Sequence, residues 1–353
     1  MQAALGIIEG YYGAPWSWAA RAETMSFLAP HGYGFYFYAP KSDPFLRSRW
    51  REDHPRETAR HLGEFAAACR GLGVRFGVGL SPLEACLDFG RDERAALARK
   101  LTFFAEIGVE DLAILFDDMR GESANLAARQ ADIAHWISER SSAKNFALCP
   151  TYYSDDPALD RLFGQRPPDY LEELGARLDP SIDIFWTGEE VCARAFASGH
   201  LDRVARALGR KPLLWDNYPV NDGARMSQYL HLRGFTGRPQ SLAGRIAAHA
   251  INPSLQPVLF RIPALTLAEA YRLGDDYEYA RAMESAAAAV AGPRLARMMR
   301  EDVALLQDTG LDRLHGAKER LRARYGAFDH PAAQEIIAWL DGAYRVADEL
   351  AAS

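Results

Sequence analysis

Two adjacent carboxylates, Asp117 and Asp118, directly follow an apolar run at Asp111–Phe116. A single aspartate after such a run most often caps the next helix, and this is the competing interpretation. Two neighbouring carboxylates differ from that case, because their repulsion resists the ionisation of both. One can then serve as an acid while the other serves as a base. The pair is therefore the first candidate for catalysis.

The adjacency of the pair indicates a particular kind of sugar chemistry. An ordinary retaining glycosidase holds its two carboxyl groups about 5 Å apart, usually on different strands. Neighbouring residues favour instead a substrate-assisted reaction, in which the 2-acetamido oxygen of the substrate attacks C1. One aspartate would orient and polarise the amide N–H, and the other would protonate the leaving oxygen.

Polar and aromatic residues also follow the other apolar runs of the chain. Amide, ammonium, carboxylate and tryptophan groups together suit a sugar, whose hydroxyls need donors and acceptors and whose ring stacks on an aromatic face. Each residue alone has a plainer explanation, such as a surface lysine, a core tryptophan, a packed tyrosine or a turn glycine. The candidates for substrate binding are Gly10, Tyr12, Lys41, Cys149, Tyr153, Thr187, Trp215, Asn217, Asp222 and Asn252.

Alternating strand and helix patterns must position these residues. Most of the apolar runs are separated by stretches of helical spacing, such as Arg56–Gly71 and Arg91–Ile107. The predicted strands are Ala4–Glu9, Gly34–Ala39, Arg75–Leu80, Asp111–Phe116, Asn145–Pro150, Asp183–Trp186, Pro212–Trp215 and Ile246–Ile251. Eight such units predict an α/β fold, a (β/α)8 TIM barrel, whose active site lies at the carboxyl ends of the strands. A doubly wound open sheet is the alternative, but no GxGxxG follows the first run.

The chain of 353 residues is longer than one usual domain, and its pattern changes near residue 272. We expect residues 1–271 to form the catalytic (β/α)8 barrel. Residues 272–353 show helical patterns punctuated by glycine and proline, so we expect a small all-helical C-terminal domain. A packing or dimerisation module is the plainest role for it, which makes a homodimer through this domain conceivable.

Composition argues against several classes of partner. The net charge is -6 and no basic stretch tracks a phosphate backbone, so we expect no nucleic acid partner. No apolar window is long enough for a membrane span. The start MQAALGIIEGYYG lacks a signal-peptide pattern, and the four cysteines form no CxxC pair, so we expect a cytoplasmic protein. No histidine, cysteine and carboxylate cluster predicts a metal site, and we expect no cofactor.

Seven motifs occur in an order that resembles a known enzyme family. They are IIEGYYGAPWSW, YFYAPKSDPFLRSRWRE, LAILFDDM, CPTYYS, FWTGEEV, PLLWDNYPVND and INPS. The sequence resembles glycoside hydrolase family 84, the protein O-GlcNAcases and their bacterial relatives. The resemblance spans residues 5–252, and we extend the fold it implies to about residue 271.

The resemblance implies a retaining exo-β-N-acetylglucosaminidase that works through an oxazoline intermediate. It implies that Asp117 orients the acetamide and that Asp118 is the general acid and base. Further residues would hold the hydroxyls or the acetamido group of the sugar: Gly10, Lys41, Asn217, Asp222 and Asn252. Tyr153 would bond the acetamide oxygen, while Cys149, Thr187 and Trp215 would shape the pocket for the acetamide methyl.

Three other functions stay open at this point. A metal-dependent barrel hydrolase would need histidine and carboxylate ligands at several strand ends, where no histidine is found. A catalytically silent glycan-binding barrel is disfavoured by the presence of both aspartates. An interaction protein would use its helical C-terminal region. The natural aglycone could be serine or threonine of a glycoprotein, a glycan or a cell-wall fragment.

Overall fold

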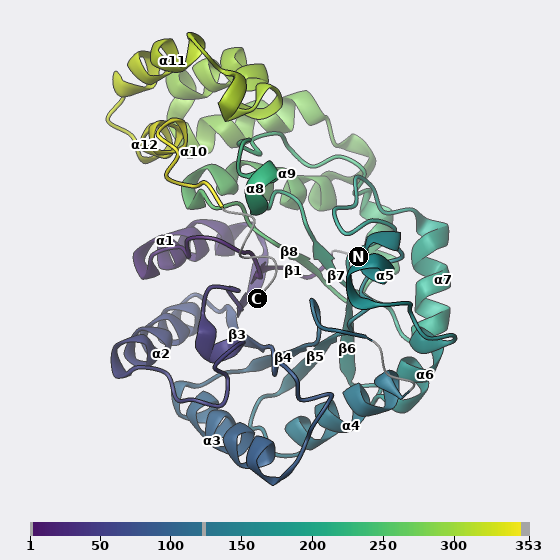
Figure 1. Cartoon of the computed structure of the whole chain (residues 1–353). Coiled ribbons are helices and arrows are strands. Elements are labelled where there is room, and N and C mark those ends of the chain that lie inside the picture. Colours follow the sequence, from purple (N-terminus) through teal and green to yellow (C-terminus); the bar gives the residue numbers. More distant parts are fainter. Residues whose placement is uncertain (1–2, 122–124, 347–353) are drawn as a thin grey trace.

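The computed structural model describes residues 3–121 and 125–346. Eight parallel strands close into a barrel in which each strand pairs with the next along the chain, and β8 pairs with β1. Figure 1 shows the strands at the centre with the helices arranged around them. The predicted (β/α)8 barrel is confirmed, and the open doubly wound sheet was the wrong alternative.

The strands lie close to their predicted positions. They are β1 (Leu5–Glu9), β2 (Tyr33–Tyr38), β3 (Arg75–Leu80), β4 (Asp111–Leu115), β5 (Asn145–Cys149), β6 (Ile182–Trp186), β7 (Leu213–Asp216) and β8 (His249–Ile251). The last strand is shorter than predicted. Ile246 and Ala248 are buried as their apolar character requires, yet strand pairing begins only at His249. An apolar run in the sequence therefore predicts which residues are buried more reliably than it predicts which residues pair in a strand.

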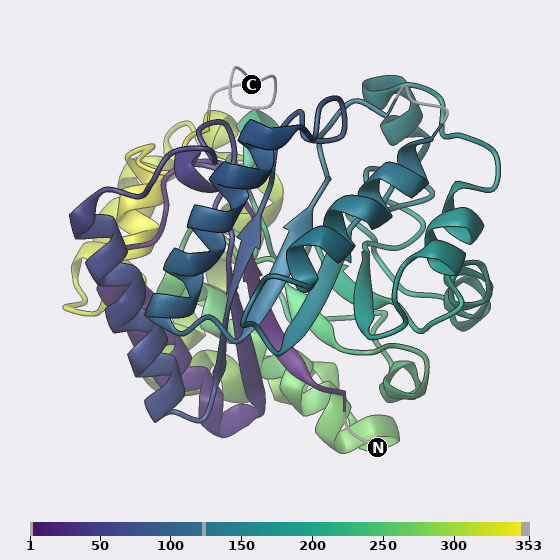
Figure 2. The same ribbon diagram turned by 90° about the horizontal axis from the view of Figure 1, so that it is seen from below.

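Helices follow most of the strands and cover the outside of the barrel (Figure 2). They are α1 (Trp18–Leu28), α2 (Arg56–Gly71), α3 (Arg91–Ile107), α4 (Leu126–Ser138), α5 (Pro157–Phe163), α6 (Tyr170–Arg177), α7 (Ser198–Leu208), α8 (Gly223–Met226) and α9 (Pro257–Leu273). The predicted helices Arg56–Gly71 and Arg91–Ile107 have the same bounds in the structure. None of the described helices is long and apolar enough to cross a membrane.

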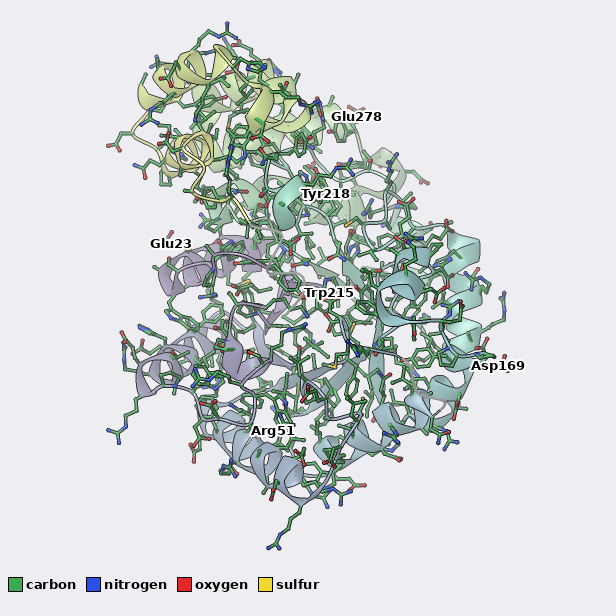
Figure 3. All side chains as sticks on the ribbon, viewed as in Figure 1. Glu23, Arg51, Asp169, Trp215, Tyr218 and Glu278 are labelled. Carbon is green, nitrogen blue, oxygen red and sulfur yellow. The ribbon has the colours of Figure 1, made fainter. Side chains whose placement is uncertain are left out.

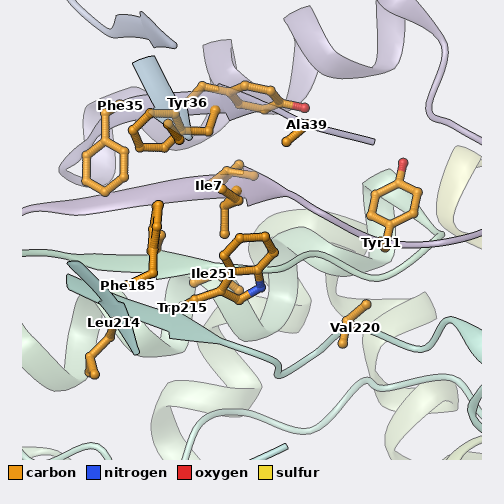
Figure 4. Close-up of a cluster of buried hydrophobic side chains, with 14 of the residues drawn as sticks. Ile7, Tyr11, Phe35, Tyr36, Ala39, Phe185, Leu214, Trp215, Val220 and Ile251 are labelled. Atoms are coloured by element: carbon orange, nitrogen blue, oxygen red, sulfur yellow. The ribbon is translucent and has the colours of Figure 1, made fainter. Parts of the chain in front are cut away.

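The interior of the barrel contains a series of aromatic rings in contact with one another. Phe37 packs edge-on against Phe185 with ring centres 5.9 Å apart, and Phe185 packs in the same way against Trp215 at 5.3 Å. Figure 4 shows Phe185 and Trp215 close together between the strands. Glycine makes room for these rings, since a Cβ on Gly77 would lie 2.6 Å from the Phe37 ring. Trp215 is thus the last aromatic ring of the barrel core toward the carboxyl ends of the strands.

Beyond the barrel the described chain is helical. Three α-helices follow α9 in the described chain: α10 (Tyr279–Val303), α11 (Ala317–Gly326) and α12 (Pro331–Leu340). They pack beside the barrel, where α10 and α12 contact α9 (Figure 1). Glu335 of α12 accepts hydrogen bonds at 2.9 Å from the backbone N–H groups of Val258 and Leu259, at the start of α9. This carboxyl group joins the helical region directly to the last helix of the barrel.

Candidate active site

Side-chain alternation along the strands decides which polar residues face the barrel axis. Gly10 points inward, because a Cβ built on it would lie 2.1 Å from the Trp215 ring. Its neighbour Glu9 points outward and is buried beneath α1, in an ion pair with Arg21 at 2.6 Å. Successive residues of a strand face opposite sides. One side of each strand end therefore supports the fold, while the other is free to bind a ligand.

The end of β7 follows the same division. Trp215 faces inward, where its Nε1–H donates to Asn217 at 3.0 Å. Asp216 faces outward and is fully buried, paired with Arg238 at 2.7 Å and with His249 at 2.9 Å. Asp216 and Glu9 are thus structural carboxylates, although each lies at a strand end beside a residue of the site.

The two adjacent aspartates do not follow this alternation, because the backbone changes direction at Asp118. An extended chain would point Asp117 and Asp118 to opposite faces. Asp118 instead has φ +56°, in the left-handed region that a non-glycine residue rarely adopts. This turn lets both carboxyl groups line the same cavity. A strained conformation of this kind at a strand end is typical of functional sites.

A cavity of about 210 Å³ is lined by Trp215. Trp215 lies near the centre of the barrel in Figure 3. All twelve candidate residues line the cavity, and Val191, Cys192 and Val220 complete the lining. The volume lies below the roughly 300–1,000 Å³ of pockets for drug-sized ligands. The space suits a single sugar ring better than an extended chain of sugars.

Asp117 is buried in the cavity, and its two carboxylate oxygens have different surroundings. Oδ2 forms a buried ion pair with the Nζ of Lys41, whose side chain is 2% exposed. Oδ1 is buried and has no hydrogen-bond partner among the described residues. A buried carboxylate oxygen without a donor is costly unless a ligand supplies one. The geometry leaves Oδ1 as an acceptor for an N–H or O–H group of a bound molecule.

Asp118 is held by two phenols. Tyr12 donates to Oδ2 at 2.8 Å, and Tyr153 donates to Oδ1 at 3.0 Å. Burial raises the pKa of both tyrosines, and the charge of Asp118 adds to this effect. The two phenols therefore stay protonated, and each hydroxyl can donate to Asp118 or accept from it. Asp118 is the more accessible member of the pair, being partly exposed where Asp117 is buried.

Amide groups form a second side of the cavity. Asn217 Oδ1 accepts from the Nδ2 of Asn252 at 2.9 Å as well as from Trp215. Asn252 Oδ1 in turn accepts the backbone N–H of Gly10 at 3.2 Å. These bonds fix four residues at or just beyond the ends of β1, β7 and β8 with respect to each other. The arrangement is preorganised, so binding a sugar requires little ordering of side chains.

Asp222 is the third carboxylate of the cavity. Its Oδ2 accepts the backbone N–H of Tyr12 at 2.7 Å. Burial raises the pKa of Asp222 to about 6, and the charge of Asp118 raises it in addition. Cys149 and Thr187 are both buried and add small side chains to the lining. Burial also raises the pKa of the Cys149 thiol, which therefore acts as a small neutral wall group.

Sequence reasoning missed three lining residues, Val191, Cys192 and Val220. They come from the loops after β6 and β7, several residues beyond the strand ends where candidates were sought. Asn217 donates its Nδ2 to the backbone carbonyl of Val191 at 2.8 Å, which draws the first of these loops over the cavity. Only the motif FWTGEEV carried a signal for this loop, and its valine looks like an ordinary core residue.

A metal-dependent barrel hydrolase would need a set of histidine, cysteine or carboxylate ligands. Across residues 3–121 and 125–346, no group of three or more histidine, cysteine, aspartate or glutamate side chains is placed to hold a metal ion. The positive charge nearest to the aspartate pair in the lining of the cavity is that of Lys41.

Comparison with known proteins agrees with this geometry and places the chain among the glycoside hydrolases. Residues 5–304 match the family described as beta-N-acetylglucosaminidase, and the chain belongs to this family. The resemblance to glycoside hydrolase family 84 is thereby confirmed.

Three relatives illustrate the similarity. The chain is 29% identical over 276 residues to the protein O-GlcNAcases of Mus musculus and Rattus norvegicus, covering 76% of this chain. It spans only 30% of the length of those two proteins. A mutant of the O-GlcNAc hydrolase of Thermobaculum terrenum superposes with a TM-score of 0.80 at 29% identity, covering 96% of this chain and 80% of that one.

Proposed function

We propose that the protein is a retaining exo-β-N-acetylglucosaminidase that removes terminal β-linked N-acetylglucosamine by substrate-assisted catalysis. The observation that carries this proposal is the state of Asp117. One of its oxygens is paired with Lys41, and the other is buried in the cavity with no donor from the part of the chain that the structure describes. The acetamido N–H of N-acetylglucosamine is a donor of the right kind for that oxygen.

In the first step the acetamide oxygen attacks C1 of the sugar while the bond from C1 to the leaving oxygen breaks. Asp117 accepts the hydrogen bond of the amide N–H, and this bond strengthens as the nitrogen gains positive charge. The ion pair with Lys41 keeps Asp117 in place for this role. The product of the step is an oxazoline, protonated or neutral according to how far the N–H proton moves to Asp117.

Asp118 supplies the proton that the leaving oxygen takes up. In the second step water attacks C1 and returns a proton to Asp118, so the carboxyl group ends as it began. The hydroxyls of Tyr12 and Tyr153 support both protonation states, because they can donate or accept. Tyr153 is also within the cavity, where it can donate to the acetamide oxygen when Asp118 carries its proton.

The rest of the lining supports recognition of one terminal sugar. Asp222, Asn217, Asn252 and Gly10 offer acceptors and donors for hydroxyls, and Trp215 offers a ring surface. Cys149 and Thr187 are small and buried, as a pocket for an acetamide methyl requires. The small volume of the cavity supports exo action on a terminal residue.

A comparison of two aryl glycosides tests this function. Nitrophenyl N-acetyl-β-glucosaminide should be hydrolysed at least about 10³-fold faster than nitrophenyl β-glucoside, the scale of losing a positioned nucleophile. A thiazoline or oxazoline mimic should inhibit much more strongly than N-acetylglucosamine, as expected of a transition-state-like species. Similar rates on both glycosides would refute substrate assistance. Binding without turnover would favour a silent glycan-binding barrel.

We further propose that the substrate is a glycoprotein or glycan that carries N-acetylglucosamine, with serine and threonine glycosides as the first to test. Hydrolysis of a panel of glycopeptides and oligosaccharides would rank them. A reducing, cytoplasmic setting is supported by the four free cysteines. Thiol titration of protein purified without reductant would test it.

We propose that residues 1–271 form the catalytic barrel and that residues 272–353 form a helical domain that packs against it. The two bonds of Glu335 to α9 support this packing, and so does the bond from Trp339 Nε1 to the Ser227 carbonyl at 3.2 Å. A homodimer through the helical domain is testable by light scattering of the full chain. A monomer at all concentrations would refute it.

A further inference from the structure

A buried arginine lies directly behind the proposed general acid. Arg47 sits in the loop after β2, just beyond the short 3-10 helix Pro44–Leu46, and is only 7% exposed. Its Nη2 lies 3.5 Å from the backbone carbonyl oxygen of Asp118. Its guanidinium carbon lies 6.0 Å from the centre of the Tyr12 ring. Arg47 therefore lies close to both Asp118 and Tyr12, the tyrosine that donates a hydrogen bond to the Asp118 carboxylate.

Packing alone does not account for an arginine at this place. Its Nη1 is buried and has no hydrogen-bond partner among the described residues. Leaving a donor of a buried guanidinium unpaired costs free energy, and an apolar side chain of similar size would avoid this cost. The positive charge and the donor of Arg47 therefore need a role that an apolar residue cannot fill.

The backbone of Asp118 presents a problem that Arg47 is placed to solve. The left-handed φ of +56° is unfavourable for an aspartate, yet it is what turns both carboxyl groups into one cavity. Such a conformation persists only when its surroundings hold it. The carbonyl of Asp118 points toward a guanidinium donor, and the carboxylate is held from the other side by Tyr12 and Tyr153.

We propose that Arg47 is a positioning residue for the general acid Asp118. Its guanidinium holds the Asp118 carbonyl and the Tyr12 ring, and thereby aims the Asp118 carboxyl group at the leaving oxygen. Its positive charge stabilises the carboxylate form that remains after proton transfer. This inference rests on the proposed function, because the role assigned to Arg47 is to position Asp118 as the general acid. Arg47 does not line the cavity, so it acts through Asp118 and not on the substrate.

The leaving group separates this role from a general structural one. Asp118 matters most for leaving groups of high pKa, because nitrophenolate departs with little protonation. Arg47→Met should therefore lower kcat/KM about tenfold or more on alkyl or seryl N-acetylglucosaminides, the scale of a lost bond to a charged group, and change it little on the nitrophenyl substrate. Arg47→Lys keeps the charge and should recover part of the loss. Arg49→Met removes an arginine from the same loop whose side chain is 53% exposed, and should leave all substrates unchanged.

A double-mutant cycle with Asp118→Asn closes the test. Once the acid is gone, Arg47→Met should cause no further loss on alkyl glycosides. An equal loss on all substrates, or an undiminished loss in the Asp118→Asn background, would show that Arg47 is merely structural and would overturn the proposal. If Arg47→Met does not fold, the same comparison is made with Arg47→Lys, which should show a smaller loss of kcat/KM that is again greater on alkyl than on nitrophenyl substrates. Asp118→Asn alone tests the proposed function, since a flat leaving-group dependence there would refute the acid itself.

Discussion

Lys41 and Asp117 form a buried ion pair that joins the loop after β2 to the end of β4. The pair uses only one oxygen of Asp117, and within residues 3–121 and 125–346 the other oxygen has no donor. A buried charge pair is sensitive to the loss of one partner, because the remaining charge is then uncompensated. Lys41 is therefore expected to fix both the charge and the direction of Asp117.

Lys41→Met should weaken catalysis through Asp117. Removing a charged hydrogen bond in a desolvated cavity costs about 1.5–3 kcal/mol, which corresponds to roughly 10- to 150-fold in kcat/KM. The measurement is kcat/KM on nitrophenyl N-acetyl-β-glucosaminide, with Lys211→Met at an exposed position as the matched control. If Lys41→Met has the kcat/KM of the wild type, the ion pair has only a structural role.

Asp222 should make sugar binding depend on pH. Burial raises its pKa to about 6, so the carboxylate, which is the better acceptor for hydroxyls, is lost as the pH falls through about 6. The affinity for uncharged N-acetylglucosamine should decrease below this pH, by up to about tenfold per unit. Asp222→Asn cannot ionise and should bind more weakly at pH 8 with no such step. Calorimetric titration at several pH values decides the matter, and a step of equal size in both proteins would exclude Asp222 as its source.

Gly10 should tolerate no side chain. A Cβ at this position would lie 2.1 Å from the Trp215 ring, which must then move and break its bond to Asn217. Gly10→Ala should lower kcat/KM at least about tenfold, since displaced positioning groups are costly in a tight site. Gly199→Ala is the control, because among the described residues its added Cβ would meet no atom within 4 Å apart from its chain neighbours and the backbone of its own helix. If Gly10→Ala keeps the kcat/KM of the wild type, the observed position of the Trp215 ring is not required for catalysis.

Much of the fold was predictable because helical and strand periodicity report burial. The bounds of α2 and α3 match the prediction, since apolar residues recur on one face and a glycine stands at or just beyond the C-terminal end of each helix. The eighth strand was predicted too early, because Ile246 is buried without pairing. Twelve lining residues were found because a barrel gathers the ends of all its strands at one face.

Other features of the site depend on tertiary structure that no local pattern contains. The left-handed backbone of Asp118 is set by its surroundings, since aspartate does not itself favour it. Arg47 lies in a loop, and only the folded chain brings its guanidinium close to the backbone of Asp118. Glu9 and Asp216 look like site residues by position, and only the inward or outward direction of each side chain distinguishes them from their neighbours.

Glu335 should make the stability of the protein depend on pH. Burial raises its pKa from 4.5 to about 7, although the two backbone N–H bonds act in the opposite direction. Because the folded-state value is the higher one, the stability contributed by protonated Glu335 is full below about pH 4.5 and is lost as the pH rises toward 7. The loss is on the order of 3 kcal/mol.

Glu335→Gln cannot ionise and should lack this dependence. Denaturant unfolding at pH 5 and pH 8 should show the wild type losing stability relative to Glu335→Gln as the pH rises. Glu319→Gln, at an exposed position of α11, should follow the wild type. Parallel curves for wild type and Glu335→Gln would mean that Glu335 does not titrate in this range.

The most direct test of the account compares Asp117→Asn and Asp118→Asn across N-acetylglucosaminides whose leaving groups have graded pKa values. Asp118→Asn should retain much activity on nitrophenyl substrates and lose far more on alkyl or seryl ones, with a gap of roughly 10²–10⁴-fold. Asp117→Asn should slow every substrate by a similar factor, because the acetamide is the same in all of them. If Asp117→Asn shows the steep dependence and Asp118→Asn shows none, the two roles are reversed. If neither variant loses activity, the adjacent aspartates are not catalytic and the central claim fails.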